Sequence, residues 1–258
     1  MAERTLRAWR GDKSGGKFED YTVNVGPGYV VLDLIHRVQA EKAGDLSCRW
    51  NCKAGKCGSC SMEINGKPKL SCMTRLGDYA EDEIITVQPM KAFPVIKDLV
   101  TDVSWNYEQK KRITPFTPGP VPADGDYRMM QVDVDRIQEF RKCIECFLCQ
   151  DTCHVLRDHA KHHKFVGPRF MIHLAQLEMH PLDTVDRIPA IKEEYGSGMC
   201  NITKCCTEVC PEHIHITDNA IIPLKERVVD RFYDPVAMLA RAIFGGPKKT
   251  IVPLPAAK

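Results

Sequence analysis

Cysteine is the residue type in this chain best suited to chemistry, and its positions are grouped. The 258 residues include 13 cysteines: five within 48–72, four within 143–153 and four within 200–210. Grouped cysteines in a chain without a secretory signal are typical of metal ligands. Thiols that only fill a hydrophobic core are the alternative, but core packing gives no reason for regular spacings. The grouping therefore predicts three metal-binding loops.

The middle group reads CIECFLCQDTC over residues 143–153, which is the spacing C-x2-C-x2-C-x3-C. In proteins with two cubane clusters, the first three cysteines of such a run bind one cluster and the fourth binds the other. Cys143, Cys146 and Cys149 are therefore predicted to share a cluster, and Cys153 is predicted to bind a second one.

The last group, CNITKCCTEVCP over residues 200–211, follows the same pattern with one change. Thr203 stands where the second cysteine of the pattern belongs. Because the fourth cysteine of each run crosses to the other cluster, both ligand sets can be predicted. The set for a [4Fe–4S] cluster is Cys143, Cys146, Cys149 and Cys210, and the set for the other cluster is Cys153, Cys200 and Cys206.

Three thiolates and a hydroxyl group favour a cluster that lacks one iron, so the second set predicts [3Fe–4S]. Cys205, two residues from Thr203, leaves an alternative open. If its thiol reaches the vacant corner, the cluster is a second [4Fe–4S]. We expect cluster binding to supply much of the folding free energy of this half of the chain.

The first group contains C-x4-C-x2-C at Cys52, Cys57 and Cys60, the spacing of plant-type [2Fe–2S] sites, with Cys72 as the fourth ligand. Two glycines in this loop allow positive φ, so that backbone N–H groups can point at the sulfurs. Cys48 is the alternative to Cys52, but it would lengthen the first spacing beyond the pattern. A zinc site is a second alternative, because zinc also accepts this spacing.

Composition limits the class of protein. The chain is 43% hydrophobic and 27% charged with a net charge of +2, which favours neither a nucleic-acid partner nor an acidic lipid surface. No stretch reaches the ~20 apolar residues of a membrane helix. The first residues also lack a secretory signal pattern, so we expect the chain in the cytoplasm, where disulfides are disfavoured.

The first half reads as a small mixed sheet packed on one helix. A strand is predicted over 18–25, and the spacing of apolar residues predicts a helix from Val31 to near Gly44. Asn65 and Gly66 predict a hairpin turn between strands 61–64 and 69–72. The last elements predicted in this half are a strand over 84–87 and a helix over 94–111.

The second half reads as helices between cysteine loops. Proline and glycine crowd residues 112–126, which predicts a semi-rigid connector. Helices are predicted from about 133, around Phe170 and over 221–229, and residues 245–258 read as a poorly ordered or partner-bound tail. The predicted domains are 1–111 for the [2Fe–2S] domain, 112–132 for the connector, 133–240 for the helical two-cluster domain and 241–258 for the tail.

Three cluster motifs in this order, on a ferredoxin-like half and a helical half, resemble one family: the iron–sulfur subunits of succinate dehydrogenase and fumarate reductase, of respiratory complex II. The resemblance covers residues 5–240 and includes FVGP at 165–168. It implies an α+β fold, with an N-terminal β-grasp [2Fe–2S] ferredoxin-like domain followed by a mainly α-helical, bacterial-ferredoxin-like domain.

The resemblance also implies an electron-transfer subunit of a membrane-bound succinate:quinone oxidoreductase, in the tricarboxylic acid cycle and the respiratory chain. Succinate oxidation or fumarate reduction takes place at FAD on a flavoprotein subunit, so no residue of this chain is catalytic. Electrons pass through [2Fe–2S], [4Fe–4S] and [3Fe–4S] to quinone. The chain is then peripheral, held at the cytoplasmic face of the membrane by an anchor subunit. The alternative is a subunit of a soluble dehydrogenase or thiol-linked reductase that is not coupled to quinone.

The sequence departs from the family near the quinone. His154 replaces the proline that many members carry after the ligand at 153, and Asn201 replaces a histidine. Arg157 and Asp158 stand where ubiquinone-reactive members carry paired tryptophans. These differences favour another quinone, such as menaquinone, or a shifted site, with His154 as the candidate quinone-site residue. The other histidines of this stretch, His159, His162 and His163, are expected on a solvated or subunit-contact surface.

Overall fold

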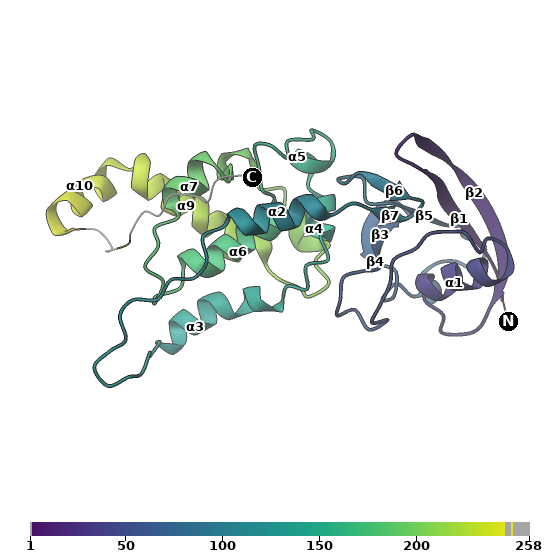
Figure 1. Cartoon of the computed structure of the whole chain (residues 1–258), viewed down its shortest axis with the longest axis horizontal. Helices are drawn as coiled ribbons and strands as arrows, with labels where there is room; N and C mark the ends of the chain where they lie inside the picture. Colours follow the sequence, from purple (N-terminus) through teal and green to yellow (C-terminus); the bar gives the residue numbers. More distant parts are fainter. Residues whose placement is uncertain (1, 246–248, 250–258) are drawn as a thin grey trace. The chain divides into compact units, whose positions relative to one another are not determined.

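The computed structural model describes residues 2–245 and 249, which form two compact units (Figure 1). The first unit takes residues up to 103 together with 144–158 and 209–212, and the second takes 104–143, 159–208 and the described residues from 213 onward. Neither unit is one continuous segment. The domain boundaries predicted along the sequence therefore stay a prediction.

The first unit is a mixed sheet with one long helix. Its strands are β1 Ala2–Asp12, β2 Gly15–Val25, β3 Ser61–Ile64, β4 Lys67–Leu70, β5 Ile85–Gln88, β6 Val95–Lys97 and β7 Val100–Thr101. Its helices are α1 Val31–Glu41, a 3-10 turn at Leu76–Asp78, α4 Leu148–Asp151 and α5 His154–Arg157. The strand order is β4-β3-β5-β1-β6-β7, with β2 paired to β1.

Strand β1 lies at the centre of this sheet, and sequence reasoning missed it. It pairs antiparallel with β2 along its whole length and parallel with β5. Its inward residues alternate as Arg4, Leu6 and Ala8. A charged residue thus takes one core position, and the Arg4 guanidinium is satisfied there by the carbonyl oxygens of Leu76 and Ala80. This buried arginine hid the period of two that predicts a strand.

Helix α1 packs on the sheet as predicted. Its buried residues, among them Leu34, Ile35 and Val38, form one core with Leu6 and Ile85 of the sheet. Fully burying each such side chain contributes about 1.5–3 kcal/mol. This core holds the strands on which the first cysteine loop rests.

The predicted hairpin is present, with its second strand two residues earlier than expected. Asn65 and Gly66 both have positive φ, at 47° and 75°, which suits a two-residue turn whose twist matches the strands. Such a turn pairs Ile64 with Lys67, so β4 begins directly after it. Cys72 consequently lies just beyond the strand, at the end of the hairpin.

The helix predicted over 94–111 is wrong in its first part. Residues 95–101 form strands β6 and β7, and only α2, Ser104–Arg112, is helical. Asp98 closes the hairpin with φ of 49°, and its buried carboxylate accepts hydrogen bonds from the Gly11 and Ser47 amides and from Arg10. These bonds to distant residues override the local helical spacing of apolar side chains.

The second unit is helical and fits the predicted α+β class. Its α-helices are α2, α3 Gln131–Gln138, α6 Pro168–Glu178, α7 Ile188–Glu193, α8 Cys205–Glu208, α9 Ile222–Phe232 and α10 Pro235–Phe244, and short 3-10 or π turns lie at Glu139–Lys142, Ser197–Met199 and Ile216–Ile221. The helices predicted from about 133, around Phe170 and over 221–229 are confirmed. Gly167 precedes α6 with φ of 83°, and Pro168 begins it, which suits the first helical position.

Between Arg112, which ends α2, and Gln131, which begins α3, the connector has no helix or long strand, as predicted, but it is hydrogen-bonded to the rest of this unit. The guanidinium of Arg187 donates to the carbonyl oxygens of Thr114 and Pro115. The amide of Thr184 donates to the Thr117 carbonyl at 3.0 Å. The connector is therefore part of the second unit's packing.

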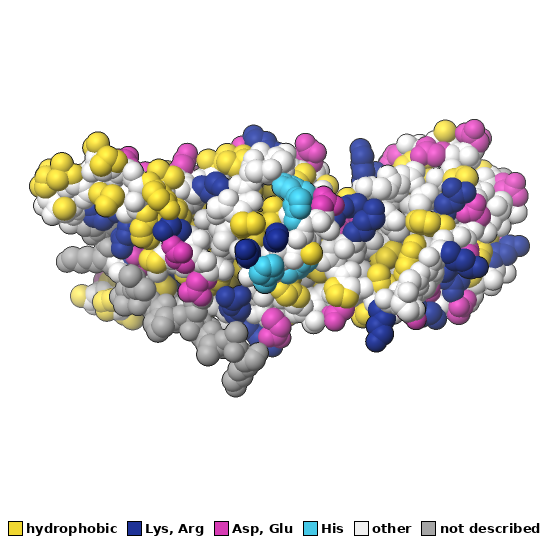
Figure 2. All heavy atoms as spheres, turned by 90° about the horizontal axis from the view of Figure 1, so that it is seen from above, with side chains coloured by type: hydrophobic (Ala, Val, Ile, Leu, Met, Phe, Trp, Pro, Cys, Tyr) yellow, Lys and Arg dark blue, Asp and Glu magenta, His cyan; other side chains and the backbone are white. Residues whose placement is uncertain are grey.

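Helix α10 was not predicted, and it carries no buried residue. Its apolar side chains, including Leu239 at 62% and Phe244 at 85% exposure, gather at one end of the second unit (Figures 1 and 2). The tail domain predicted from 241 begins within α10, and of residues 245–258 only 245 and 249 are described. No helix in the described part of the chain has the length and apolar character needed to cross a membrane.

A matched pair of glycines tests this fold. Gly196 has φ of 67°, and a Cβ there would lie 1.8 Å from the Lys164 carbonyl oxygen. We expect Gly196→Ala to lower the free energy of unfolding by at least ~1–3 kcal/mol in denaturant titrations. A Cβ on Gly198 meets nothing within 4 Å, so Gly198→Ala is the control. Equal stability of the two variants would contradict the structure.

Candidate iron–sulfur sites

The first cysteine loop joins α1 to β3, and its backbone is shaped to surround a charged group. Lys53, Gly55 and Gly58 have φ of 54°, 68° and 69°. The amides of Ala54 and Lys56 both donate to the Cys52 sulfur at 3.3 Å. Amide donors aimed at one sulfur stabilise its thiolate form, which is the form that binds iron. The loop therefore fits the donor set that a cluster requires.

The four predicted [2Fe–2S] ligands are brought together. Burial raises the pKa of Cys57, but hydrogen bonds from Ser59 and Cys52 outweigh it and lower that pKa to about 6. Burial and the adjacent Cys60 raise the pKa of Cys72 to about 12. Cys57 therefore lies within hydrogen-bonding distance of Cys52, and Cys72 lies within hydrogen-bonding distance of Cys60. Iron binding must therefore displace a proton from Cys72, so cluster loading is pH-dependent.

Cys48 lies differently from these four thiols. Its side chain packs against the hydrophobic core, and burial raises its pKa to about 12. Its sulfur is 3.8 Å from the Arg49 carbonyl oxygen. Cys72 shares this raised pKa, so the pKa alone does not distinguish a ligand. Cys52 is favoured over Cys48 because its sulfur receives two amide hydrogen bonds.

The middle cysteine run turns sharply between its ligands. Glu145 and Phe147 have φ of 55° and 62°, and these left-handed conformations redirect the chain after Ile144 and after Cys146. Three ligands are buried in the first unit: Cys149 on α4, Cys153 directly before α5, and Cys146 two residues before α4. Cys143 and Cys210 are half-buried. Cys210 belongs to the first unit, and Cys143 belongs to the second.

Within the first unit the [2Fe–2S] loop and the middle run approach closely. A Cβ on Gly58 would lie 2.7 Å from the Cys146 Cα. Only glycine permits this approach, because any side chain would strike the backbone of the middle run. Cys146 also shares a small apolar cluster with Cys60 and Cys72.

The last cysteine run also contains left-handed backbone conformations between its ligands. Ile202 and Lys204 both have φ of 63°, and the Ile202 amide donates to the Cys200 sulfur at 3.5 Å. Lys225 adds a cation, because its Nζ donates to the Cys200 carbonyl oxygen at 2.7 Å. Cys206 is buried, with its sulfur 3.4 Å from the Thr217 hydroxyl.

The position of the missing cysteine holds both groups named in the sequence analysis. The Thr203 hydroxyl lies 3.3 Å from the Cys205 sulfur. Neither group is fully removed from solvent, since Thr203 is exposed and Cys205 is half-buried. Within residues 2–245 and 249, no three His, Cys, Asp or Glu side chains are arranged for one metal ion. A cluster does not need that arrangement, since its thiolates bind different irons.

Arg157, which stands where some family members have a tryptophan, has a structural partner that the sequence did not reveal. Its Nη1 lies 2.5 Å from the Glu63 carboxylate on β3, which is fully buried. Asp151 is buried close by; burial raises its pKa to about 7, the charge of Glu63 adds to this and Arg157 opposes it. Arg157 is therefore the main cation compensating two buried carboxyl groups.

The histidines fall in two units. His154 begins α5 in the first unit and is half-buried. His159 and His163, in the second unit, are exposed as expected, and His162 packs edge-on against Trp105 at 4.8 Å between ring centres. Asn201 is exposed. The role of His154 at a quinone site stays a prediction.

Comparison with known proteins agrees with the two kinds of cluster loop. Residues 5–108 match the model of a 2Fe-2S iron–sulfur cluster binding domain, and residues 139–214 match that of a 4Fe-4S dicluster domain. The fumarate reductase iron–sulfur subunit of Mycobacterium tuberculosis is 34% identical over 78% of this chain and 82% of its own length. The succinate dehydrogenase iron–sulfur subunit of Bacillus subtilis is 33% identical over 70% of this chain and 71% of its own length.

This chain belongs to the family of iron–sulfur subunits of succinate dehydrogenase and fumarate reductase. A solved chain of the Mycobacterium smegmatis Sdh1 complex in the apo form is 63% identical, with a TM-score of 0.88 over 91% of this chain and 99% of that one. As a family member it is an electron-transfer subunit with [2Fe–2S] and [4Fe–4S] clusters. The resemblance, fold class and subunit function predicted from the sequence are thereby confirmed.

A pair of cysteine variants tests the [2Fe–2S] ligands. We expect Cys52→Ser to abolish the reduced-state electron paramagnetic resonance signal of this cluster or to change its g values. Cys48→Ser is the matched control and should retain the signal, because Cys48 packs in the core. The reverse pattern would show that Cys48 is the ligand.

A second test concerns the buried ion pair. We expect Arg157→Leu to lower the free energy of unfolding of this chain by ~3–5 kcal/mol, because it removes the nearer cation of the buried Glu63 carboxylate and leaves only the half-exposed Lys91 at 3.8 Å. Arg136→Leu is the control: its guanidinium is half-exposed and 3.7 Å from Asp133, so its loss should cost no more than ~1 kcal/mol. Denaturant titration of both variants checks this, and similar losses would contradict the compensating role of Arg157.

Proposed function

We propose that this subunit relays electrons between the FAD of a flavoprotein subunit and a membrane quinone through [2Fe–2S], [4Fe–4S] and [3Fe–4S] clusters. The observation that carries the proposal is the third loop, in which Thr203 replaces a ligand in an otherwise complete two-cluster pattern. A bound cluster supplies one-electron transfer, which divides the two-electron chemistry of succinate and of quinone into single steps. The chain itself takes no part in bond breaking.

The proposed ligand sets follow the sequence pattern. They are Cys52, Cys57, Cys60 and Cys72 for [2Fe–2S]; Cys143, Cys146, Cys149 and Cys210 for [4Fe–4S]; and Cys153, Cys200 and Cys206 for [3Fe–4S]. Amide donors at Cys52 and Cys200 support these sets, since they favour thiolates. Such hydrogen bonds also raise the reduction potential of the group they surround.

We further propose that the chain assembles with a flavoprotein subunit and a membrane anchor subunit, as a peripheral component at the cytoplasmic face. The similar Mycobacterium smegmatis chain belongs to an Sdh1 complex. The exposed apolar side chains of α10 support assembly, because a face of this kind is typical of interaction sites. The quinone is proposed to be menaquinone, with His154 near it.

The test of function is quinone reduction by the membrane complex. The complex is purified in detergent, and succinate-dependent reduction of a water-soluble menaquinone analogue is compared with reduction of an artificial dye that accepts electrons from the flavoprotein. We expect Cys206→Ser to abolish quinone reduction and to spare dye reduction. Quinone reduction that persists without this ligand would show that the third cluster is not part of the relay. Purification without any anchor subunit, or a wild-type complex that reduces the dye but no quinone, would favour a soluble dehydrogenase or thiol-linked reductase.

The iron content of the third cluster has its own test. Thr203→Cys supplies the missing thiol, and we expect the near-isotropic signal of the oxidised protein to fall as a fourth iron binds. Cys205→Ser is the control and should keep the wild-type signal. If Cys205→Ser instead creates the oxidised-state signal, Cys205 is a ligand and the native cluster is [4Fe–4S].

A further inference from the structure

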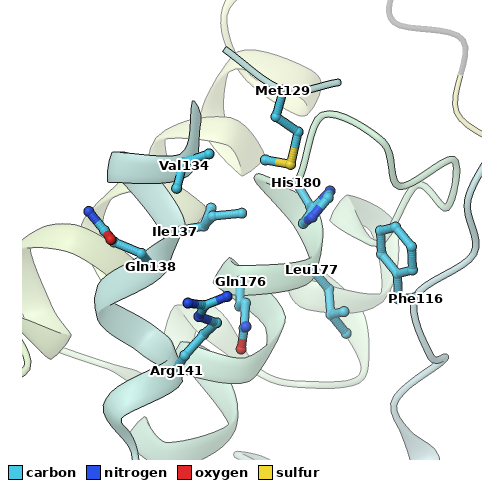
Figure 3. Close-up of a pocket in the computed structure, with 9 residues that line it drawn as sticks. All are labelled: Phe116, Met129, Val134, Ile137, Gln138, Arg141, Gln176, Leu177 and His180. Carbon is cyan, nitrogen blue, oxygen red and sulfur yellow. The ribbon is translucent and has the colours of Figure 1, made fainter. Parts of the chain in front are cut away.

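A cavity in the second unit is lined by residues outside all three predicted ligand sets. It has a volume of about 360 Å³ and lies between α3 and α6 beside the connector (Figure 3). Its lining consists of Phe116, Met129, Val134, Ile137, Gln138, Arg141, Gln176, Leu177 and His180. None of these is a cysteine, so the cavity is chemically separate from the cluster loops. Its volume is at the small end of the range for small-molecule sites.

The wall of the cavity is apolar. Val134 and Ile137 come from α3, Leu177 comes from α6, and Met129 and Phe116 come from the connector side (Figure 3). These side chains give a hydrocarbon group an apolar wall to contact. Removing such a group from water raises affinity roughly fourfold for each methylene that fits.

The polar end of the cavity is built around Arg141. Its guanidinium points toward the side of the cavity that holds Gln176 (Figure 3). Among the described residues, neither side chain has an ion-pair or hydrogen-bond partner. Neighbouring groups differ: Arg136 pairs with Asp133, and the Gln138 amide donates to Asp135.

His180 does not add a second charge. Its Nδ1 accepts a hydrogen bond from the Leu182 amide at 3.2 Å, so that nitrogen carries no proton. Its ring packs edge-on against Phe116, with 4.7 Å between ring centres. Burial lowers its pKa, which keeps the imidazole neutral at pH 7. The cavity therefore presents one cation, the amides of Gln176 and Gln138, and an apolar wall; the Gln138 amide is already bonded to Asp135.

We propose that this cavity binds a small amphiphilic monocarboxylate, with its carboxylate on Arg141 and Gln176 and its hydrocarbon chain along Val134, Ile137 and Leu177. A guanidinium can hold a carboxylate through two parallel N–H donors, which gives this head group an advantage over a neutral or cationic one. The volume limits the ligand to a medium-length chain or a single aromatic ring. The site thus adds a small-acid binding function to the electron-transfer subunit.

The probe is octanoate, titrated into the cluster-loaded full chain and followed by calorimetry. We expect saturable binding at one site, with octylamine and butyrate at least ~10-fold weaker, because the first has the wrong charge and the second too short a chain. Absence of saturable octanoate binding, or equal binding of octylamine, would overturn the proposal.

Variants locate the binding. Arg141→Gln should weaken octanoate at least ~10-fold and remove the preference over octylamine. Arg136→Gln is the matched control on the same helix and should leave octanoate binding unchanged. Leu177→Trp fills the cavity and should block binding, while an unchanged visible spectrum shows that the clusters and fold persist. Octanoate binding that survives both Arg141→Gln and Leu177→Trp would place the ligand elsewhere and contradict the proposal.

Discussion

Thiolate sulfurs brought close together repel one another, and the cysteine loops of this subunit are shaped to offset that repulsion. In the first loop, positive φ at Lys53, Gly55 and Gly58 accompanies two amide donors to the Cys52 sulfur. In the last loop, positive φ at two residues accompanies an amide donor to Cys200. Left-handed conformations of non-glycine residues are strained, at about 1–3 kcal/mol each. Cluster binding is the interaction that can offset this cost, so folding and metal loading are coupled.

The packing around the first two cysteine loops fixes their positions within the first unit. The hairpin β3–β4 delivers Cys60 and Cys72 to one place, and the core under α1 fixes the hairpin. Glu63 of β3 reaches Arg157 of α5, so a buried ion pair joins the hairpin to the helix that follows Cys153. Buried pairs of this kind add little net stability, but breaking one is costly, which suits a role in positioning.

The two kinds of cluster domain could be predicted from cysteine spacing, because cluster geometry dictates how far apart ligands lie along a chain. The Asn65-Gly66 hairpin could be predicted equally well, since its turn type depends on these two adjacent residues. The remaining features depend on contacts between distant segments. Strand β1 was hidden by a buried arginine, and the strands at 95–101 depend on Asp98 bonding to Gly11 and Ser47. The partner of Arg157 lies 94 positions away in sequence, so no local pattern could reveal it.

Three different clusters are proposed to form a relay that ends in a three-iron centre. Electron paramagnetic resonance of the air-oxidised complex, repeated after reduction with dithionite, tests this relay most directly. We expect a near-isotropic signal only in the oxidised protein and two further signals only in the reduced protein. An oxidised protein without a signal would contradict the three-iron centre, because it would mean that the third site holds four irons or none.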